Sequence, residues 1–396
     1  MGEAANILEL LFWACAALVF YSYVAYTVLI WCCSRRAVPQ QRPTVAANDL
    51  PSMVLLIAAY NEQAMIEQRI QNALALDYPP ERMQIVIASD GSTDQTAAIA
   101  GRYAERGVRV VDYPHRRGKT TVLNTTVTSL DSQIIMLSDA NTFFDRQAAL
   151  HVAGWFADPS VGVVCGKLVL KDRRTGRNSD GLYWRYETFI KTCEGKLGAL
   201  LGSNGAIYAI RRDLFPRIPD DTIVDDFVIP LLAKLNTGCR IVYDEQAAAE
   251  EEIAPKINDE FRRRARIGAG GYQAIGLLWK LLDPRRGWIA VSFLSHKVLR
   301  WLCPFFLIGM FLSALILAHR PLFGVIVVAQ AAVMLLSPFV SRLPGGNPAM
   351  RLVRLAAMFT LMNTALCVGF FRWLRRSQGG AWTRTLRVAE IPEVQR

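Results

Sequence analysis

The sequence predicts an α/β protein in which a doubly wound, mostly parallel sheet is joined to transmembrane and interfacial α-helices. Three observations support this fold class. Short apolar runs alternate with amphipathic stretches between residues 52 and 255, an arrangement that gives a parallel sheet with helices on both faces. Long apolar runs flank this region on both sides. The excess of positive charge lies after it.

The alternating region contains five short runs rich in β-branched residues. Because these runs are continuously apolar, we expect strands that are covered on both faces. The amphipathic stretches 62–76, 93–106 and 119–130 are the expected helices. Such sheets bind ligands beyond the carboxyl ends of their strands, so polar residues that follow a strand are candidate site residues. The expected strands are 53–59, 84–89, 108–111, 133–138 and 161–164.

Four apolar runs are each long enough to cross a hydrocarbon core of about 30 Å as a helix. The first run lacks the basic start and the cleavage site of a signal peptide, so we interpret it as a retained anchor. The stretch 288–300 mixes aromatic side chains with cations and is expected to lie in the membrane interface. The four runs are 7–33, 301–318, 321–340 and 352–371.

The formal charge of +11 is divided unevenly along the chain. Residues 1–255 hold 25 Lys and Arg against 29 Asp and Glu, a net charge of −4. Residues 256–396 hold 20 against 5, a net charge of +15. The excess therefore lies among the membrane segments, where it suits anionic headgroups, and nucleic acid is not an expected partner. The eight cysteines show no paired metal-ligand spacing, which favours structural thiols in a reducing compartment.

Acidic residues occur where a doubly wound sheet holds its ligand. Asp90 and Asp139 each follow an expected strand, and Asp225 with Asp226 forms a third acidic point. Carboxylates supply the oxygen ligands that a divalent cation needs beside a nucleotide diphosphate, and a carboxylate can deprotonate a sugar hydroxyl. The arginines within 262–266 are candidates for stabilising a departing diphosphate. Taken singly, each acid also fits a helix cap.

Six short motifs follow one another in order: Ala58–Glu62, Ser89–Asp94, Gly118–Asn124, Ser138–Asn141, Gly202–Gly205 and Val224–Phe227. Together they resemble the signatures of membrane-embedded family 2 glycosyltransferases, such as hyaluronan, chitin-oligosaccharide, cellulose and poly-N-acetylglucosamine synthases. The resemblance implies a GT-A-like domain that transfers a hexose or N-acetylhexosamine from a UDP-sugar to a growing glycan. One candidate base with no nucleophile beside it predicts inversion at the anomeric carbon.

The resemblance also implies roles for individual residues. Asp226 would be the base, and Gly202 and Ser203 would meet the terminal sugar of the acceptor. Asp139 would begin the metal motif for Mg2+ or Mn2+, in which Asn141 replaces the second carboxylate. The residues that would bind the donor are Ala59, Glu62, Asp90, Lys119, Asp139 and Asp225, with Arg263, Arg264 and Arg266 at its diphosphate.

Two features favour different acceptors. The family's Gln-x-x-Arg-Trp motif has only a rough counterpart in Glu260–Arg264, without the tryptophan, which favours transfer of a single sugar to a membrane lipid. The several C-terminal spans and the Gly202–Gly205 segment favour a polymer, which is the preferred interpretation. A non-catalytic membrane sensor that binds sugar nucleotides is a further alternative. Expected partners are the donor, a glycan or lipid-linked acceptor and the bilayer; protein partners are left open.

The arginines after the first span place the soluble region on the cytoplasmic side, and the resemblance implies an integral protein of a bacterial inner membrane. Three further spans would put the C-terminus outside, whereas the arginines of the tail favour the inside. The number of spans therefore stays open. The predicted segments are an N-terminal transmembrane anchor (1–34), a linker (35–51), a cytoplasmic glycosyltransferase domain (52–255), basic and interfacial helices (256–300), transmembrane helices (301–372) and a basic tail (373–396).

Overall fold

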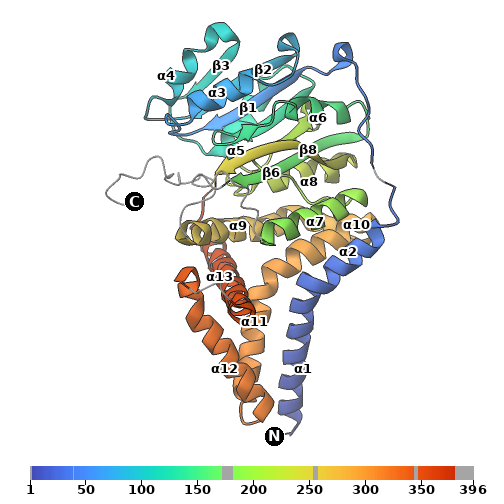
Figure 1. Ribbon diagram of the computed structural model, residues 1–396, viewed down its shortest axis with the longest axis vertical. Helices are drawn as coiled ribbons and strands as arrows, with labels where there is room; N and C mark the ends of the chain where they lie inside the picture. Colours follow the sequence, from blue (N-terminus) through green and yellow to red (C-terminus); the bar gives the residue numbers. More distant parts are fainter. Residues whose placement is uncertain (1, 39, 172–181, 253–256, 343–346, 380–396) are drawn as a thin grey trace. The chain divides into compact units, whose positions relative to one another are not determined.

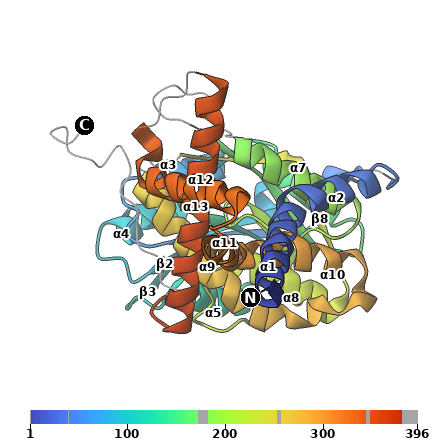
Figure 2. The same ribbon diagram turned by 90° about the horizontal axis from the view of Figure 1, so that it is seen from below.

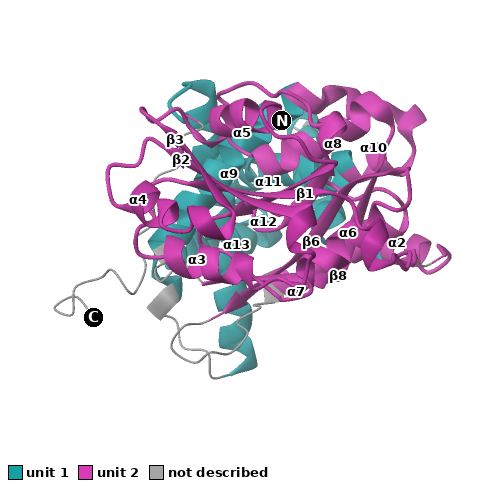
Figure 3. Cartoon of the chain, turned by 90° about the horizontal axis from the view of Figure 1, so that it is seen from above, with its two compact units in different colours: residues 1–29, 254–276, 293–378 teal, residues 30–253, 277–292, 379–396 magenta. Residues whose placement is uncertain are grey.

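The computed structural model of the protein describes residues 2–38, 40–171, 182–252, 257–342 and 347–379. The chain forms two compact units, which are coloured separately in Figure 3. Unit 1 comprises residues 1–29, 254–276 and 293–378, and unit 2 comprises residues 30–253, 277–292 and 379–396. The predicted boundary between residues 255 and 256 and most of the predicted tail lie outside the described residues.

Unit 2 is built on one eight-stranded sheet with the order β3-β2-β1-β4-β7-β6-β8-β5. β1 (Met53–Ala59) pairs in parallel with β2 (Met83–Asp90) on one side and with β4 (Ile134–Asp139) on the other. β3 (Val108–Tyr113) extends this parallel half beyond β2. All seven residues of β1 are buried, as expected for a strand that is covered on both faces.

The second half of the sheet mixes both directions. β7 (Tyr208–Arg211) pairs antiparallel with β4 and with β6 (Val161–Lys171). β8 (Arg240–Glu252) runs parallel to β6 and antiparallel to β5 (Phe143–Phe144). The sheet is therefore mixed rather than mostly parallel. The sequence did not reveal β5, β7 and β8 because β5 and β7 are short and because β8 ends in a run of alanines and glutamates, which are depleted in strands.

Helices connect the strands of unit 2 (Figure 1). The three expected helices are present but are shorter than their amphipathic stretches, because each stretch begins or ends in turns. The core joins the parallel strands to α3 and α6, and it includes Leu55, Ile57, Ile66 and Ile70. Burying one such side chain stabilises a fold by about 1.5–3 kcal/mol. The helices are α3 (Ile66–Leu74), α4 (Thr96–Gly101), α5 (Lys119–Thr128), α6 (Ala148–Trp155), α7 (Leu182–Lys196) and α8 (Asp225–Thr237).

The predicted linker packs against the sheet of unit 2. Arg42 donates to Asp244 Oδ2 over 2.9 Å and to Gln246 Oε1 over 3.0 Å. Asp244 is 5% exposed and also accepts a hydrogen bond of 2.7 Å from Trp155 Nε1. Because Arg42 satisfies a buried carboxylate, the chain that leads from the first apolar helix is fixed to the domain.

Unit 1 is helical. Its core includes Phe12 and Phe323, whose ring centroids lie 5.3 Å apart. Among the described residues, four helical stretches are long and apolar enough to cross a membrane: Glu3–Ser34, Trp288–Ile316, Pro321–Val340 and Pro348–Leu374. The second stretch continues through the predicted boundary between residues 300 and 301. The first stretch comprises α1 (Gly2–Phe20), the π-helix η1 (Tyr21–Ala25) and α2 (Tyr26–Ser34).

The other helices of the C-terminal part follow in order. α9 (Ile257–Leu278) precedes the second apolar stretch, which comprises α10 (Trp288–Ser292), the π-helix η8 (Phe293–Val298) and α11 (Leu299–Ile316). α12 (Pro321–Leu336) and the short helix η9 (Ser337–Arg342) form the third stretch, and α13 (Pro348–Leu374) forms the fourth. Residues 30–34 and 288–292 of these stretches belong to unit 2.

Candidate active site

Asp90 and Asp139 lie at the same edge of the sheet. Asp90 ends β2 and Asp139 ends β4, and these strands flank β1 on its two sides. The register places Ala58 opposite both Ala88 and Asp139, so the three strands end together. The strand order reverses between β1 and β4, which is the position at which open α/β sheets bind ligands.

Lys119 joins two of the predicted acids. Its Nζ lies 2.7 Å from Asp139 Oδ1 and 3.4 Å from Asp225 Oδ2. Burial alone would lower the pKa of the Lys119 ammonium, but the charges of Asp139, Asp225 and Asp226 outweigh it, and the pKa is raised. Lys119 therefore stays charged at neutral pH and offsets part of the negative charge around it.

Gly205 lies between Asp139 and Asp226. Its backbone N–H donates to Asp226 Oδ2 over 2.8 Å. A methyl group added at Gly205 would lie 3.4 Å from Oδ2 of Asp139, 3.4 Å from Oδ2 of Asp226 and 3.6 Å from Nζ of Lys119. The two carboxylates and the ammonium therefore surround one small space next to the backbone of residue 205.

The acids of this cluster differ in exposure. The side chain of Asp139 is 38% exposed, whereas that of Asp225 is 10% exposed. Burial raises the pKa of Asp225, Lys119 opposes this, and the charges of Asp226 and Asp139 raise it further. Asp139 is thus open to a ligand from solvent, while Asp225 supports the cluster from inside.

Asp90 holds the loop that leads into α5. Its Oδ1 accepts the backbone N–H of Arg117 over 2.6 Å, and its Oδ2 accepts that of Gly118 over 2.9 Å. The residue is 1% exposed. Gly118 has a positive φ of 88°, a conformation that costs glycine little. Asp90 therefore fixes the position of Lys119, and its predicted contact with the donor stays a prediction.

Polar residues of α5 hold the segment that delivers Asp225 and Asp226 to the cluster. Thr120 donates to the carbonyl of Thr222 over 2.9 Å, and Asn124 donates to the carbonyl of Ile218 over 2.8 Å. The sequence analysis assigned no role to either residue. Both lie within the Gly118–Asn124 motif, and polar side chains on the buried face of a helix were the available signal.

Gly202 and Ser203 support the start of α8. The hydroxyl of Ser203 donates to the backbone carbonyl of Asp226 over 2.7 Å. Gly202 has a φ of 73°, and a Cβ there would lie 2.9 Å from the ring of Phe227. These contacts orient Asp226, whereas the predicted contact with the acceptor sugar stays a prediction.

The buried guanidinium of Arg69 lies behind the cluster and was missed in the sequence. Arg69 has no exposed surface, and it donates to Asn72 Oδ1 over 3.0 Å and to Ser138 Oγ over 3.2 Å. Burial lowers the pKa of Arg69 to about 9, and the charge of Asp139 opposes the shift. Ser138 in turn donates to the carbonyl of Ala206 over 3.0 Å. Arg69 therefore links β4 to the segment that carries Gly205.

Comparison with known proteins assigns part of the chain to a family. Residues 54–217 match the family described as Glycosyl transferase family 2. The chain carries a family 2 glycosyl transferase domain. The matched residues of the domain include Lys119, Asp139 and Gly205, but they end before Asp225 and Asp226, which join the cluster through tertiary structure.

Two relatives of the chain are named for a polysaccharide product and for a glucosylated diacylglycerol product. The chain is 26% identical over 242 residues to a poly-beta-1,6-N-acetyl-D-glucosamine synthase of Staphylococcus aureus, covering 59% of this chain and 58% of the relative. It is 23% identical over 291 residues to a beta-monoglucosyldiacylglycerol synthase of Synechocystis, covering 68% of this chain and 59% of the relative. The chain thus spans less than two thirds of each relative.

A solved structure shares the fold. A mannosyltransferase of Pyrobaculum calidifontis, in complex with GDP-Man and Mn2+, superposes with a TM-score of 0.72 at 21% identity. The match covers 93% of this chain and 99% of the other. The GT-A-like architecture expected for the family 2 domain is therefore confirmed, with its sheet mixed in direction.

Asn141, the second residue of the predicted metal motif, has a defined hydrogen-bond partner. The amide nitrogen of Asn141 donates to Glu251 Oε1 over 2.7 Å, so its carbonyl oxygen is the atom left to act as a ligand. The described residues contain no group of three His, Cys, Asp or Glu side chains placed to hold a metal ion. The oxygens of Asp139 and Asn141 nevertheless have the chemistry that Mg2+ and Mn2+ prefer, and a diphosphate can complete such a site.

The remaining predicted residues have structural positions but untested roles. Ala59 ends β1 and is buried, and the backbone N–H of Glu62 donates to Thr96 Oγ1 over 2.8 Å at the start of α3. Arg263, Arg264 and Arg266 lie on α9, which begins in unit 1. Arg264 forms an ion pair of 2.7 Å with Glu260 of the same helix. The predicted contacts of these arginines with phosphate stay predictions.

Proposed function

We propose that the protein transfers a hexose or N-acetylhexosamine from a UDP-sugar to a growing glycan at a membrane, with inversion of the anomeric carbon. The observation that carries this proposal is the convergence of Lys119, Asp139 and Asp226 around Gly205. The family 2 domain supports sugar transfer, and the relatives named poly-beta-1,6-N-acetyl-D-glucosamine synthases support a polysaccharide product.

Asp226 is the group that takes the proton of the acceptor. Its Oδ2 accepts the N–H of Gly205, which leaves Oδ1 for the acceptor hydroxyl. As the hydroxyl proton passes to Asp226, the acceptor oxygen bonds to the anomeric carbon, and the bond between that carbon and the diphosphate oxygen breaks. UDP leaves with the electron pair of the broken bond, and attack from the opposite side inverts the configuration.

Lys119 and the metal motif act on the leaving group. Lys119 brings a positive charge into the space that faces Asp139 and Gly205, where it stabilises the negative charge of the diphosphate. Asp139 and Asn141 would hold Mg2+ or Mn2+, which neutralises charge on the diphosphate when bound. Asp225 keeps Lys119 in place through their ion pair.

The apolar helices assign the protein to a membrane. The four candidate spans and the arginines that follow the first of them support an integral protein of a bacterial inner membrane, with its catalytic domain on the cytoplasmic side. An acceptor that grows at the bilayer surface is then within reach of the domain.

A donor screen tests the proposal. Purified protein is incubated with several UDP-sugars and with Mg2+, Mn2+ or a chelator, and release of UDP is measured beside product size and anomeric configuration. We expect cation-dependent release with one donor, and a polymer with inverted linkages. The variant D226N is the matched inactive control. A single sugar on a lipid would contradict the polymer, retained configuration would contradict inversion, and release equal to that of D226N would contradict the enzyme.

A further inference from the structure

α13 lies across its neighbours in unit 1, although its length and composition would allow it to span a membrane. Figure 2 shows α11 end-on and α13 lengthwise, while Figure 1 shows α11 lengthwise and α13 foreshortened. In a bilayer that α1 and α11 cross, α13 would therefore be strongly tilted away from the bilayer normal. An orientation of this kind is typical of helices that lie in the membrane interface.

Contacts place α13 at one end of the helices of unit 1. The ring of Phe359 lies 5.0 Å from that of Tyr23 in η1, and the ring of Phe370 lies 4.9 Å from that of Phe305 in α11. A Cβ at Gly369 would lie 2.6 Å from the carbonyl oxygen of Ala265, so α13 approaches α9 closely.

The opposite end of these helices carries a different charge pattern. Arg320, at the start of α12, pairs with Glu9 of α1, and Glu3 also lies at that end of the first span. Arg35 and Arg36 follow the first span in the sequence. Acidic residues thus lie in the first part of the first span and arginines follow it, as expected when the chain after this span is on the cytoplasmic side.

The charges of α13 fit a helix that lies in the headgroup layer. Arg351 and Arg354 lie in its first two turns, and Arg372 lies in its last turn. Between them the sequence is mostly apolar, and Leu352 and Leu355 are 68% and 53% exposed. A spanning helix would carry one of these two groups of cations to the outer side of the bilayer, which the positive-inside rule disfavours, whereas an interface helix keeps both groups on one side.

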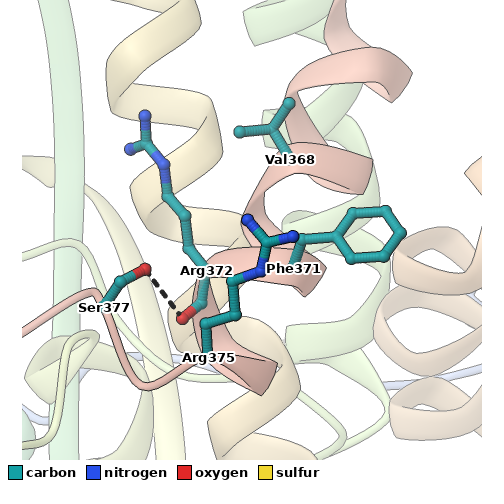
Figure 4. A pocket seen from close by; sticks show the side chains of 5 residues that line it. All are labelled: Val368, Phe371, Arg372, Arg375 and Ser377. Carbon is teal, nitrogen blue, oxygen red and sulfur yellow. Dashed lines mark hydrogen bonds between the residues drawn. The ribbon is translucent and has the colours of Figure 1, made fainter.

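A hollow of about 430 Å³ lies at the C-terminal end of α13. Arg372, Arg375 and Ser377 line it beside Val368 and Phe371, as Figure 4 shows. Arg372 donates to Gln378 Oε1 over 3.3 Å, which uses one of its five N–H groups. Guanidinium groups beside apolar side chains match a phosphate attached to an acyl chain.

We propose that α13 is an interface helix on the cytoplasmic leaflet and that Arg372 and Arg375 bind the phosphate of an anionic phospholipid in this hollow. The chain then crosses the bilayer three times, through the stretches Glu3–Ser34, Trp288–Ile316 and Pro321–Val340. With three crossings the end of α13 lies on the same side as Arg35 and Arg36, and the conflict between the span count and the basic tail disappears.

Sidedness is tested with reporters fused to the C-terminus of the full chain. We expect green fluorescent protein to be fluorescent and alkaline phosphatase to be inactive, because both are on the cytoplasmic side. The variant H319C, in a background with accessible cysteines replaced, should react with an impermeant maleimide only from outside. Active phosphatase with dark fluorescent protein would overturn the three-crossing topology.

Depth along α13 is measured with spin labels at L352C, L355C and F371C in reconstituted protein. Similar shallow depths at all three positions are expected for an interface helix. Labels at residues 352 and 371 that report opposite leaflets would overturn the in-plane orientation. Residue 355 is the internal comparison, because a span would place it deeper than residue 352.

The lipid site is tested with nanodiscs of phosphatidylcholine alone or mixed with phosphatidylglycerol. Removing one cationic side chain near an anionic surface weakens binding about fivefold, and removing two weakens it roughly thirtyfold. If the hollow binds the phosphate directly, R372Q/R375Q should lower the preference for phosphatidylglycerol by more than this general effect. The matched pair R351Q/R354Q should lose only the general attraction. An equal loss of preference for phosphatidylglycerol in the two double variants would overturn the site. The same holds if inorganic phosphate in phosphatidylcholine nanodiscs stabilises the protein as much as phosphatidylglycerol does.

Discussion

The backbone N–H of Gly205 donates a hydrogen bond of 2.8 Å to Oδ2 of Asp226. This contact joins the loop that follows α7 to the first turn of α8, and the same oxygen of Asp226 borders the space shared with Asp139 and Lys119. The carboxylate of Asp226, the proposed base, is therefore held by a backbone group. Only proline would remove a backbone donor, and it would also fix φ, but the space beside the donor can be filled with a methyl group.

Filling that space should reduce activity without unfolding the domain. In G205A the new methyl group lies at ordinary contact distance, 3.4 Å, from oxygens of Asp139 and Asp226, and residue 205 has no positive φ. We expect kcat/KM to fall by about a hundredfold, because the methyl group occupies space that the substrates need and displaces their reacting atoms by an ångström or so, while Tm changes little. The control is G101A, where a Cβ meets nothing within 4 Å. Full activity of G205A would place the reaction elsewhere.

Replacing Asp226 by Asn should separate binding from chemistry. The amide oxygen of D226N can still accept the Gly205 N–H, but the side chain no longer accepts a proton. We expect kcat to fall roughly 10²- to 10⁴-fold with donor affinity nearly unchanged, measured by UDP release and by calorimetry. D131N, at an exposed acid away from the cluster, should behave as the parent. A near-normal kcat for D226N would dismiss Asp226 as the base.

Asp225 should make the domain less stable as pH rises from the acidic range. Its pKa is raised in the folded state by burial, so the folded protein binds this proton more tightly than the unfolded one. The contribution of Asp225 to the free energy of unfolding therefore falls as pH rises from its unfolded pKa through its folded pKa. D225N should show a Tm difference from the parent that becomes more positive over this range. A difference that becomes more negative would reverse the sign of the shift.

Arg69 should matter more for activity than for stability. In R69M, Asn72 Oδ1 keeps its hydrogen bond from the N–H of Phe144, and Ser138 keeps its bond to Ala206. Both oxygens keep a partner, and the variant removes a buried guanidinium whose Nε makes no hydrogen bond, so Tm should change little. We expect kcat to fall on the order of tenfold, since the Gly205 segment loses a tether. R102M at an exposed site is the control, and unchanged kcat in R69M would remove its positioning role.

Two ion pairs of unit 2 should differ in their contribution to stability. D244A leaves the N–H of Trp155 and the guanidinium of Arg42 without their shared carboxylate, so we expect a loss of roughly 2–3 kcal/mol. D77A breaks the pair with Arg146, whose side chain is 75% exposed, and should cost less than about 1 kcal/mol. Denaturant unfolding of the domain measures both. Equal losses would mean that burial of Asp244 is not what strengthens its interactions.

Local pattern was sufficient for much of the fold. The run 53–59 was apolar because the sheet buries both faces of β1, and this is the property that a continuous apolar run reports. Asp139 could be selected for the same reason, since it follows such a run. The sequence did not predict β7 and β8, because their own residues carry weak strand signals. β7 pairs with β4 and β8 pairs with β6, and these partners lie far away in the chain.

The sequence by itself determined that acids follow the strands of an α/β domain and that apolar helices flank it, because burial and bilayer thickness impose patterns on neighbouring residues. Tertiary structure decided which groups meet: Gly205 between Asp139 and Asp226, Arg69 behind β4, and α13 across α11. These relationships depend on distances between residues remote in the chain and on helix orientation. Neither quantity produces a periodic pattern of residue types in the sequence.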